Sequence, residues 1–419
     1  MSELSYLEKL LDGVEVKRLP LGELGELVRG NGLPKSDFTE SGVPAIHYGQ
    51  IYTFYGLSTE TTKSFVSQET AKKLKKVNSG DVVITNTSEN FTDVGKALVY
   101  LGKEQAVTGG HATIFKPNST IIGKYFAYFT QTDSFANEKR KYSKGTKVID
   151  VSASDMAKIT IPIPCPNNPE KSLAIQSEIV RILDKFTALT AELTAELTAE
   201  LNMRKKQYNY YRDQLLSFDE EQEKPIYLEK LLDGVEVEWL PLSDLARIRN
   251  GKDHKSLSEG EFPVYGSGGI MRYVDTYAYN KPSVLIPRKG SLGNLFFIDV
   301  PFWTVDTIFY TEIDEAQIRP KYLYYFLSTV GLGEMNQAGG VPSQTQSVLN
   351  KLKIPIPCPD NPEKSLAIQS EIVRILDKFD TLTNSITEGL PREIELRQKQ
   401  YEYYRDLLFS FPKPETASN

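Results

Sequence analysis

The chain has 419 residues, of which 40% are hydrophobic and 25% charged, and its formal net charge is −6. This length allows two or three domains, each with its own core. No apolar run approaches the roughly 18 residues of a membrane-spanning helix, and residues 1–4 lack the features of a signal peptide. These features predict no membrane-spanning helix, and we expect a cytoplasmic location.

The acidic charge is unevenly distributed. Residues 17–160 contain 19 Lys and Arg against 14 Asp and Glu, residues 237–353 contain 12 of each, and the remainder contains 18 against 29. The acidic excess therefore lies in the connecting segments, where a solvated helix face explains it. The negative net charge alone does not exclude a nucleic-acid partner.

An internal repeat organises the chain. Residues 161–186 return at 354–379 with Asn167 replaced by Asp360, and residues 204–218 resemble 397–411 at the same offset of 193. Residues 6–16 also return at 227–237. The inserts between these segments show no similarity of the same order. A repeated frame around divergent inserts indicates two modules with one scaffold and two specificities.

The first insert alternates short apolar runs with Gly, Asn and Pro, which predicts a mixed α/β domain. Its candidate strands are residues 81–85, 96–101 and 112–115, and its candidate helices are 67–76 and 125–130.

The longest predicted helix covers residues 169–218, with Asn168 and Pro169 as its start signal. Thr-Ala-Glu-Leu occurs three times in succession within residues 190–201. About fifty residues would make a rod of roughly 75 Å. An apolar stripe that includes the spacer leucines Leu193, Leu197 and Leu201 requires a partner helix.

The second insert has the same mixed pattern, with candidate strands at 283–287, 295–298 and 307–311 and a candidate helix at 320–327. The helix that follows offers the partner stripe, but Gly389-Leu390-Pro391 should interrupt it. We expect two long antiparallel helices with one insert at each end and a pseudo-two-fold between the halves. Two helical hairpins on independent domains are the alternative.

No catalytic constellation is recognisable in the sequence. Cys165 and Cys358 occupy equivalent places in the repeat, and the three histidines, His47, His111 and His254, are scattered. The sequence contains neither a methyltransferase motif with its glycine-rich cofactor loop nor a Walker lysine motif. We therefore expect no catalytic residue and no metal site in this chain.

Candidate DNA-contacting residues lie in polar loops of both inserts. Residues 139–147 carry five cations and no acid, and glycine-rich loops at 265–269, 288–291 and 339–344 can present donors and acceptors to base edges. A solvated loop and plain turns are the competing explanations. The candidates here are Lys139, Arg140, Lys144, Lys147, Tyr265, Ser267, Arg288, Lys289, Ser343 and Gln344.

The doubled frame, the Ile-Pro-Ile-Pro segment before each long helix, the divergent inserts and the Thr-Ala-Glu-Leu tandem resemble one family over essentially the whole chain. It is the DNA-specificity (S) subunit of type I restriction-modification systems, in the subfamily with this tandem in its central conserved region. The resemblance implies that each insert is a target recognition domain for one half of a bipartite DNA site. It also implies that residues 43–50 and 262–269 are corresponding early loops, which adds His47, Tyr48 and Gln50 to the DNA-binding candidates.

The same resemblance implies partners and cofactors. Double-stranded DNA, two methyltransferase subunits and restriction (translocase) subunits would be the partners, and the helices would set the spacer and dock the methyltransferases. This subunit would hold no cofactor, because S-adenosylmethionine belongs to the methyltransferase and ATP with magnesium to the restriction partner. A coiled-coil scaffold with two protein-binding ends, and a single-chain enzyme combining modification and recognition, are the alternatives.

The predicted domains follow from the repeat and the resemblance. They are an N-terminal conserved segment (1–16), a first target recognition domain (17–160), a central conserved region with the long helix (161–218), a linker with the repeated segment (219–237), a second target recognition domain (238–353) and a C-terminal conserved region (354–419).

Overall fold

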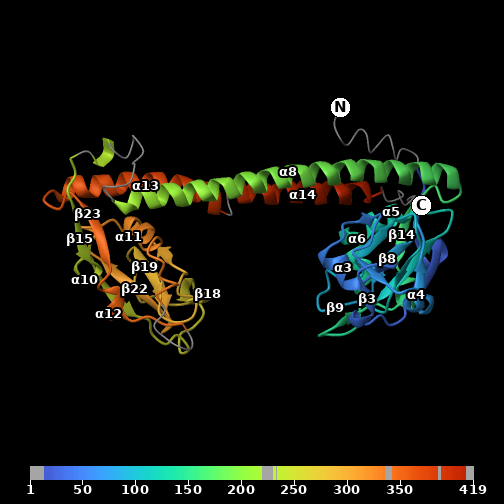
Figure 1. Ribbon diagram of the computed structural model, residues 1–419, viewed down its shortest axis with the longest axis horizontal. Coiled ribbons are helices and arrows are strands. Elements are labelled where there is room, and N and C mark those ends of the chain that lie inside the picture. The colour runs from blue at the N-terminus through green and yellow to red at the C-terminus, as the bar shows by residue number, and fades with distance from the viewer. Residues whose placement is uncertain (1–13, 219–229, 233, 336–341, 386–387, 412–419) are drawn as a thin grey trace, which may run out of the picture. The chain divides into compact units, whose positions relative to one another are not determined.

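The computed structural model describes residues 14–218, 230–232, 234–335, 342–385 and 388–411 (Figure 1). Most of the predicted N-terminal segment, residues 219–229 of the linker and the glycine loop at 339–341 lie outside the described residues. The chain divides into two compact units, one of Met1–Ala195 with Glu395–Asn419 and one of Glu196–Ile394. Helix α8 (Pro169–Ser217) contributes residues to both units.

In the first unit, the two ends of the insert are tied together by β1 (Val16–Pro20), which pairs antiparallel with β14 (Thr160–Pro164). Two five-stranded sheets follow, in the orders β2-β12-β8-β10-β5 and β3-β6-β4-β11-β7, with a short β13-β9 pair beside them. The strands are β2 (Gly25–Arg29), β3 (Phe38–Thr39), β4 (Val43–Ile46), β5 (Ser58–Thr59), β6 (Ser64–Val66), β7 (Lys75–Val77), β8 (Val82–Thr85), β9 (Thr87–Ser88), β10 (Ala97–Tyr100), β11 (Ala106–Thr108), β12 (Ala112–Pro117) and β13 (Ile149–Asp150).

The main core of this unit joins the sheet of β8, β10 and β12 to α5 and to the long helices (Figure 1). Tyr125 and Phe126 of α5 are fully buried in this core, which also contains Phe115 of the sheet and Ile179 of α8. The helices of the unit are α2 (Leu21–Leu24), η1 (Lys35–Asp37), α3 (Tyr48–Thr53), α4 (Gln68–Lys73), α5 (Gly123–Phe129), α6 (Asp133–Arg140) and α7 (Ala153–Met156), with the first part of α8 and most of α14 (Leu390–Leu408).

The second unit repeats this plan with fewer strands. β15 (Val237–Pro241) pairs with β23 (Lys353–Pro357), and the two larger sheets have the orders β16-β22-β19-β20 and β18-β17-β21. The other elements are α10 (Leu242–Leu245), β16 (Ala246–Asn250), β17 (Phe262–Gly266), β18 (Gly269–Val274), β19 (Ser283–Pro287), β20 (Phe296–Ile298), β21 (Trp303–Thr304), β22 (Ile308–Ile313), α11 (Pro320–Leu327), α12 (Gln346–Leu349) and α13 (Pro362–Asn384).

Within each unit, the long helices pack antiparallel through equivalent residues. In the first unit Phe186 of α8 lies 5.8 Å from Tyr404 of α14, and in the second Tyr211 of α8 stacks on Phe379 of α13 at 5.6 Å between ring centroids. Phe186 corresponds to Phe379 and Tyr211 to Tyr404 at the repeat offset of 193. Each unit therefore pairs one copy of the first half of the frame with one copy of the second.

The expected break in the second long helix is confirmed. α13 ends at Asn384 and α14 begins at Leu390, with Gly389 between them at φ +80°. Pro391 then stands in the first turn of α14, where its missing N–H costs no helical hydrogen bond.

The expectation of one continuous apolar stripe along α8 is wrong in the middle of the helix. Leu189 is 53% exposed, and Leu193, Leu197 and Leu201 are only half-buried. Leucines spaced by four residues drift about 40° around the helix at each step, so a tandem of such steps cannot keep one face toward a partner.

The predicted fold class, mixed α/β inserts with long helices, is confirmed, as are the strands predicted in both inserts. The second sheet of each unit was not predicted. Its strands in the first unit have only two to four residues, and in the second unit β17 and β18 lie in sequence that is rich in glycine and turn residues.

Candidate nucleic-acid interface

In the first unit, three strand ends meet at one place. His47 and Tyr48 follow β4, Asn86 and Thr87 follow β8, and His111 precedes β12. The Asn86 N–H donates to the His111 carbonyl at 2.8 Å, and the Thr87 hydroxyl lies 2.9 Å from His111 Nδ1. The Tyr48 ring lies 5.1 Å from the His111 ring. Residues far apart in sequence thus form one polar and aromatic surface.

The candidates from the early loop contribute differently to this surface. His47 caps α3, since its Nδ1 accepts from the Gly49 N–H at 3.2 Å, and its ring lies 4.6 Å from that of Tyr48. Burial, followed by the charges of Lys35 and His111, lowers the pKa of His47. The Gln50 amide donates to the Ser64 hydroxyl at 2.5 Å. The segment predicted as an early loop is strand β4 followed by helix α3. Gln50 therefore joins α3 to β6, and Tyr48 lies at the centre of the ring cluster.

The basic run at 139–147 divides into a buried residue and exposed ones. Lys139 is only 4% exposed, and its ammonium donates to the carbonyls of Phe91 and Val94 at 2.8 and 2.6 Å. Burial lowers the pKa of Lys139 to about 8. The predicted phosphate contact of Lys139 is corrected accordingly, because both its location and its hydrogen bonds are those of a core residue.

The other cations of this run lie on the surface. Arg140 is exposed with its guanidinium 5.0 Å from the Phe91 ring, and the Lys144 ammonium pairs with Asp155 at 2.8 Å. The Lys144 and Asp150 backbones exchange two hydrogen bonds, which forms a hairpin with exposed Lys147 in its turn. This hairpin adjoins the three strand ends, because Asp150 pairs with Thr87.

In the second unit, the described residues of the three loops predicted from sequence also come together. The Ser267 N–H donates to the Thr307 hydroxyl at 3.3 Å, and the N–H groups of Arg288 and Lys289 donate to the Thr307 carbonyl at 2.8 and 3.2 Å. Lys289 and Ser343 form a β-bridge. Half-buried Tyr265, whose pKa burial raises, lies 5.7 Å from the Phe296 ring.

Gln344 requires a correction of its predicted role. Its backbone N–H donates to the Arg288 carbonyl at 3.0 Å, and its side-chain amide donates to the Pro287 carbonyl at 2.6 Å. The residue is only 2% exposed. Gln344 therefore holds the loop of Arg288 in place and does not present its amide to a base.

The two surfaces are topologically equivalent. In the first unit Ile46 pairs with Thr108 in the parallel strands β4 and β11, and in the second unit Tyr265 pairs with Thr304 in the parallel strands β17 and β21. Ile46 therefore corresponds to Tyr265, and two residues further along the chain Tyr48 corresponds to Ser267. The Asn86 to His111 hydrogen bond likewise corresponds to that of Arg288 to Thr307. The candidates from the two inserts occupy the same place in the fold with different side chains.

Sequence reasoning missed Thr87, His111 and Thr307 as members of these surfaces, and it missed the fully buried Asn86, whose backbone N–H holds the His111 turn in place. Asn86 and Arg288 come directly after the buried strands β8 and β19, and His111 and Thr307 come directly before β12 and β22. Strand ends were recognisable, but the neighbouring strand in space was not. His47 and His111, which look scattered in sequence, both contact Tyr48.

Each insert is fastened to the long helices by the same contacts. The Tyr128 hydroxyl and Lys124 ammonium of α5 bind Asp184 of α8 at 2.7 and 2.8 Å. In the second unit, Tyr325 and Lys321 of α11 bind Asp377 of α13 at 2.6 and 2.8 Å. Burial raises the pKa of both tyrosines, so their hydroxyls remain protonated donors.

A shared Lys-Tyr-x-x-Tyr-Phe motif underlies this attachment, at residues 124–129 and 321–326. The first tyrosine of each motif donates to the carbonyl of the second residue of an Ile-Pro-Ile-Pro segment, Pro162 or Pro355, at 2.7 and 2.8 Å. The inserts are therefore similar where they contact the frame and divergent where the strand ends meet.

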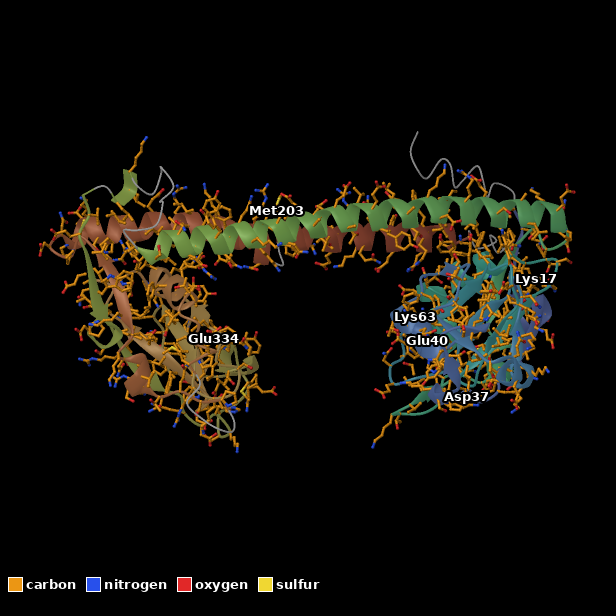
Figure 2. All side chains as sticks on the ribbon, in the orientation of Figure 1. Lys17, Asp37, Glu40, Lys63, Met203 and Glu334 are labelled. Atoms are coloured by element: carbon orange, nitrogen blue, oxygen red, sulfur yellow. The ribbon has the colours of Figure 1, made fainter. Side chains whose placement is uncertain are left out.

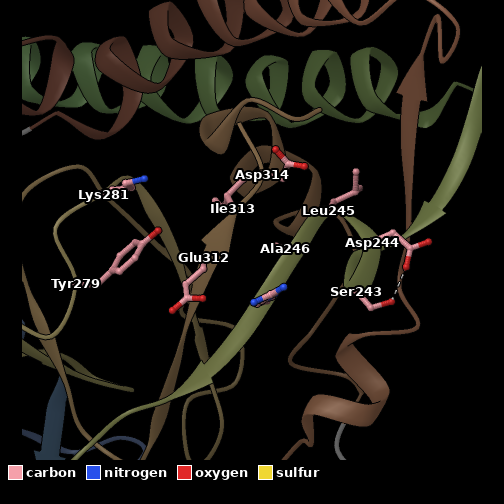
Figure 3. Close-up of a pocket in the computed structure, with 10 residues that line it drawn as sticks. Ser243, Asp244, Leu245, Ala246, Tyr279, Lys281, Glu312, Ile313 and Asp314 are labelled. Carbon is pink, nitrogen blue, oxygen red and sulfur yellow. Dashed lines mark hydrogen bonds between the residues drawn. The ribbon is translucent and has the colours of Figure 1, made fainter. Parts of the chain in front are cut away.

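The second unit also has an open hollow of about 580 Å³ (Figure 3). Charged and polar side chains line it, and Ser243 donates to Asp244 at 3.1 Å at one side. The hollow lies at the Ala246 end of β16 and the Ile313 end of β22. The loop of Arg288 lies at the opposite end of this sheet, so the hollow is separate from the strand-end surface.

The described part of the chain contains neither a candidate metal site nor a candidate membrane span. No cluster of three or more His, Cys, Asp or Glu side chains suits a metal ion there. No helix among the same residues has the length and apolar character needed to cross a membrane.

Two mixed inserts on a repeated helical frame, each with its own strand-end surface, define a class of modular recognition protein. A family model described as the type I restriction modification DNA specificity domain matches residues 13–203 and 234–396. The chain belongs to this family of type I restriction-modification specificity subunits.

Relatives and solved structures agree with this assignment. The Escherichia coli type I restriction enzyme EcoR124I/EcoR124II specificity subunit is 41% identical, with 100% of both chains covered. The Escherichia coli EcoprrI specificity subunit is 35% identical over 93% of each. A chain solved in work on assembly and conformational transition of the type I system has a TM-score of 0.65 at 15% identity, covering 95% of this chain and 98% of its own.

The HsdS subunit of Thermoanaerobacter tengcongensis has a TM-score of 0.52 at 14% identity, covering 95% of this chain and 97% of its own. The structural likeness shows the fold. The sequence matches show the family, and they support DNA specificity over the coiled-coil scaffold alternative.

Proposed function

We propose that this chain is the sequence-specificity subunit of a type I restriction-modification complex and that each insert reads one half of a bipartite DNA target. The observation that carries the proposal is the equivalence of the two strand-end surfaces, which share backbone hydrogen bonds and differ in side chains. Equal architecture with unequal side chains is what two half-sites of different sequence require.

The chain would recognise DNA without catalysing a reaction on it. S-adenosylmethionine would bind to the methyltransferase partner, and ATP with magnesium to the restriction partner. The predicted boundaries at residues 16 and 160 would fall within the β1 and β14 pair, which closes the first insert. A complex acting on cellular DNA would work in the bacterial cytoplasm.

We propose that the repeated frame docks two methyltransferase subunits through equivalent tyrosines. Tyr210 of α8 is 57% exposed and Tyr403 of α14 is 62% exposed. They correspond at the offset of 193. Met203 of α8, labelled in Figure 2, adds exposed apolar surface near Tyr210 in sequence. Tyrosine is among the residues that contribute most to protein interfaces.

Methylome sequencing of cells that express this chain with its methyltransferase tests the proposed function. The expected result is one split motif, with two fixed half-sites and a spacer of constant length. A library of mixed-sequence duplexes bound by the purified complex provides an independent measurement. If neither experiment enriches a split motif, the specificity function is wrong.

A further inference from the structure

We propose that the His111 imidazole donates its Nε2 hydrogen to the N7 atom of a purine in the half-site read by the first insert. His111 would then be a specificity-determining residue that its sequence context does not reveal. The inference rests on the proposed function and names one contact within it.

The backbone fixes the position of His111. Its φ is +65°, a left-handed conformation that histidine adopts more readily than most residues with a Cβ. The His111 carbonyl accepts from the Asn86 N–H, which ties the turn to the end of β8. Gly109, two residues before His111, permits the close packing of this turn, since a Cβ at residue 109 would lie 2.2 Å from the Cβ of Leu33. The imidazole therefore projects from an ordered turn.

The side-chain contacts orient the ring. Nδ1 lies 2.9 Å from the Thr87 hydroxyl, and the ring lies 5.1 Å from that of Tyr48. The side chain is nevertheless exposed. Because Nδ1 is engaged, Nε2 on the other side of the ring is the nitrogen available to a ligand.

The proposed contact uses the form of the ring in which Nε2 carries a hydrogen. When the Thr87 hydroxyl donates to Nδ1, the neutral ring carries its hydrogen on Nε2, and a protonated ring carries one there as well. Adenine and guanine both present N7 as an acceptor in the major groove.

The equivalent residue of the second insert behaves differently. Thr307 is half-buried, and its hydroxyl accepts from the Ser267 N–H at 3.3 Å. This short side chain joins two loops, whereas the longer His111 side chain extends from the same position. A substitution at His111 should therefore affect only the first half-site.

Two variants of the complete complex test the inference. His111→Gly removes the imidazole and accepts the positive φ, and His111→Asn keeps a polar side chain that tolerates the same backbone. Both are expected to reduce discrimination about tenfold at one base pair of the first half-site. The second half-site and the spacer should remain unchanged in the methylome.

The atom is identified by replacing each purine of the first half-site in turn with its 7-deaza analogue. One replacement should weaken binding by the unsubstituted complex about tenfold and leave binding by His111→Gly unchanged, which is the non-additivity expected of a direct contact. Lys103→Asn is the matched control, because Lys103 follows β10 at the opposite end of the sheet.

Full retention of the first half-site in both variants would overturn the inference, and so would an equal response of wild type and His111→Gly to every 7-deaza purine. These results leave the split motif intact. Failure of the proposed function would instead remove the motif from the unsubstituted complex, so the two failures are distinguishable.

Discussion

Lys139 and Lys147 belong to one basic run, yet their surroundings differ. The Lys139 ammonium is buried among the carbonyls of Phe91 and Val94, and Lys147 is exposed in a hairpin turn beside the strand-end surface. Charge density along a sequence therefore overstates the number of cations available to phosphate. The distinction leads to separate predictions for the two residues.

Lys139 should give the first unit a pH-dependent stability. Its pKa of about 8 in the folded protein lies below the value of about 10.4 in an unfolded chain. Between these values the unfolded chain binds more protons, so the free energy of unfolding should rise with pH, by at most about 3 kcal/mol. Lys139→Met should remove this rise. Urea unfolding of the unsubstituted protein and of Lys139→Met at pH 7.5 and 9.5 measures this rise. The same change in the free energy of unfolding with pH in both proteins would contradict the prediction.

Lys147 should contribute to DNA affinity without contributing to sequence discrimination. Lys147→Gln is expected to weaken binding of matched and unmatched duplexes alike and to reduce the slope of log affinity against log salt by about 1. Salt titrations of the complete complex check this. Lys103→Gln, at the far end of the sheet, should leave the slope unchanged.

At the scale of elements, α5 and α11 attach each insert to the helical frame. Asp184 and Asp377 each accept a tyrosine hydroxyl and pair with a lysine. Because the aspartates lie in the repeated helices and the partners in the inserts, these contacts fix the orientation of each recognition surface on its helix.

Asp184→Ala and Asp377→Ala should each destabilise their own unit by about 1 to 3 kcal/mol, since a partly buried tyrosine hydroxyl loses its acceptor. The effects should be similar because the contacts are equivalent. Hydrogen exchange of α5 and α11 amides resolves the two units. Lys185→Gln, an exposed change beside Asp184, is the control. Loss of protection in both units from a single substitution would disprove local attachment.

At the scale of the whole molecule, α8 is one continuous helix shared by both units, with the Thr-Ala-Glu-Leu tandem at the boundary between them. We expect the length of α8 to set the number of base pairs between the two half-sites. Each four-residue unit adds about 6 Å and about 40° of rotation, whereas one base pair adds about 3.4 Å.

Deleting residues 198–201 should therefore shorten the preferred spacer by about one or two base pairs and leave both half-sites unchanged. Methylome sequencing of cells expressing the deletion variant gives both quantities at once. If the spacer length is unchanged in the deletion variant, the tandem does not set it.

The docking tyrosines give a second prediction at this scale. Tyr210→Ala and Tyr403→Ala should each weaken assembly with one methyltransferase subunit about tenfold or more, and the double variant should lose both. Analytical ultracentrifugation of the mixed subunits distinguishes the three cases. Tyr277→Ala, at an exposed tyrosine of the second insert, should assemble normally.

The sequence by itself determined the doubled frame, the mixed inserts, the long helices and the break before Pro391, because repeat identity, hydrophobic period and proline chemistry act locally along the chain. Only the tertiary structure decided which loops share a surface. The meeting of Tyr48, Thr87 and His111 depends on strand order, and strand order is set by pairing between distant segments. The same packing buried Lys139 and Gln344, which no local pattern distinguishes from exposed neighbours.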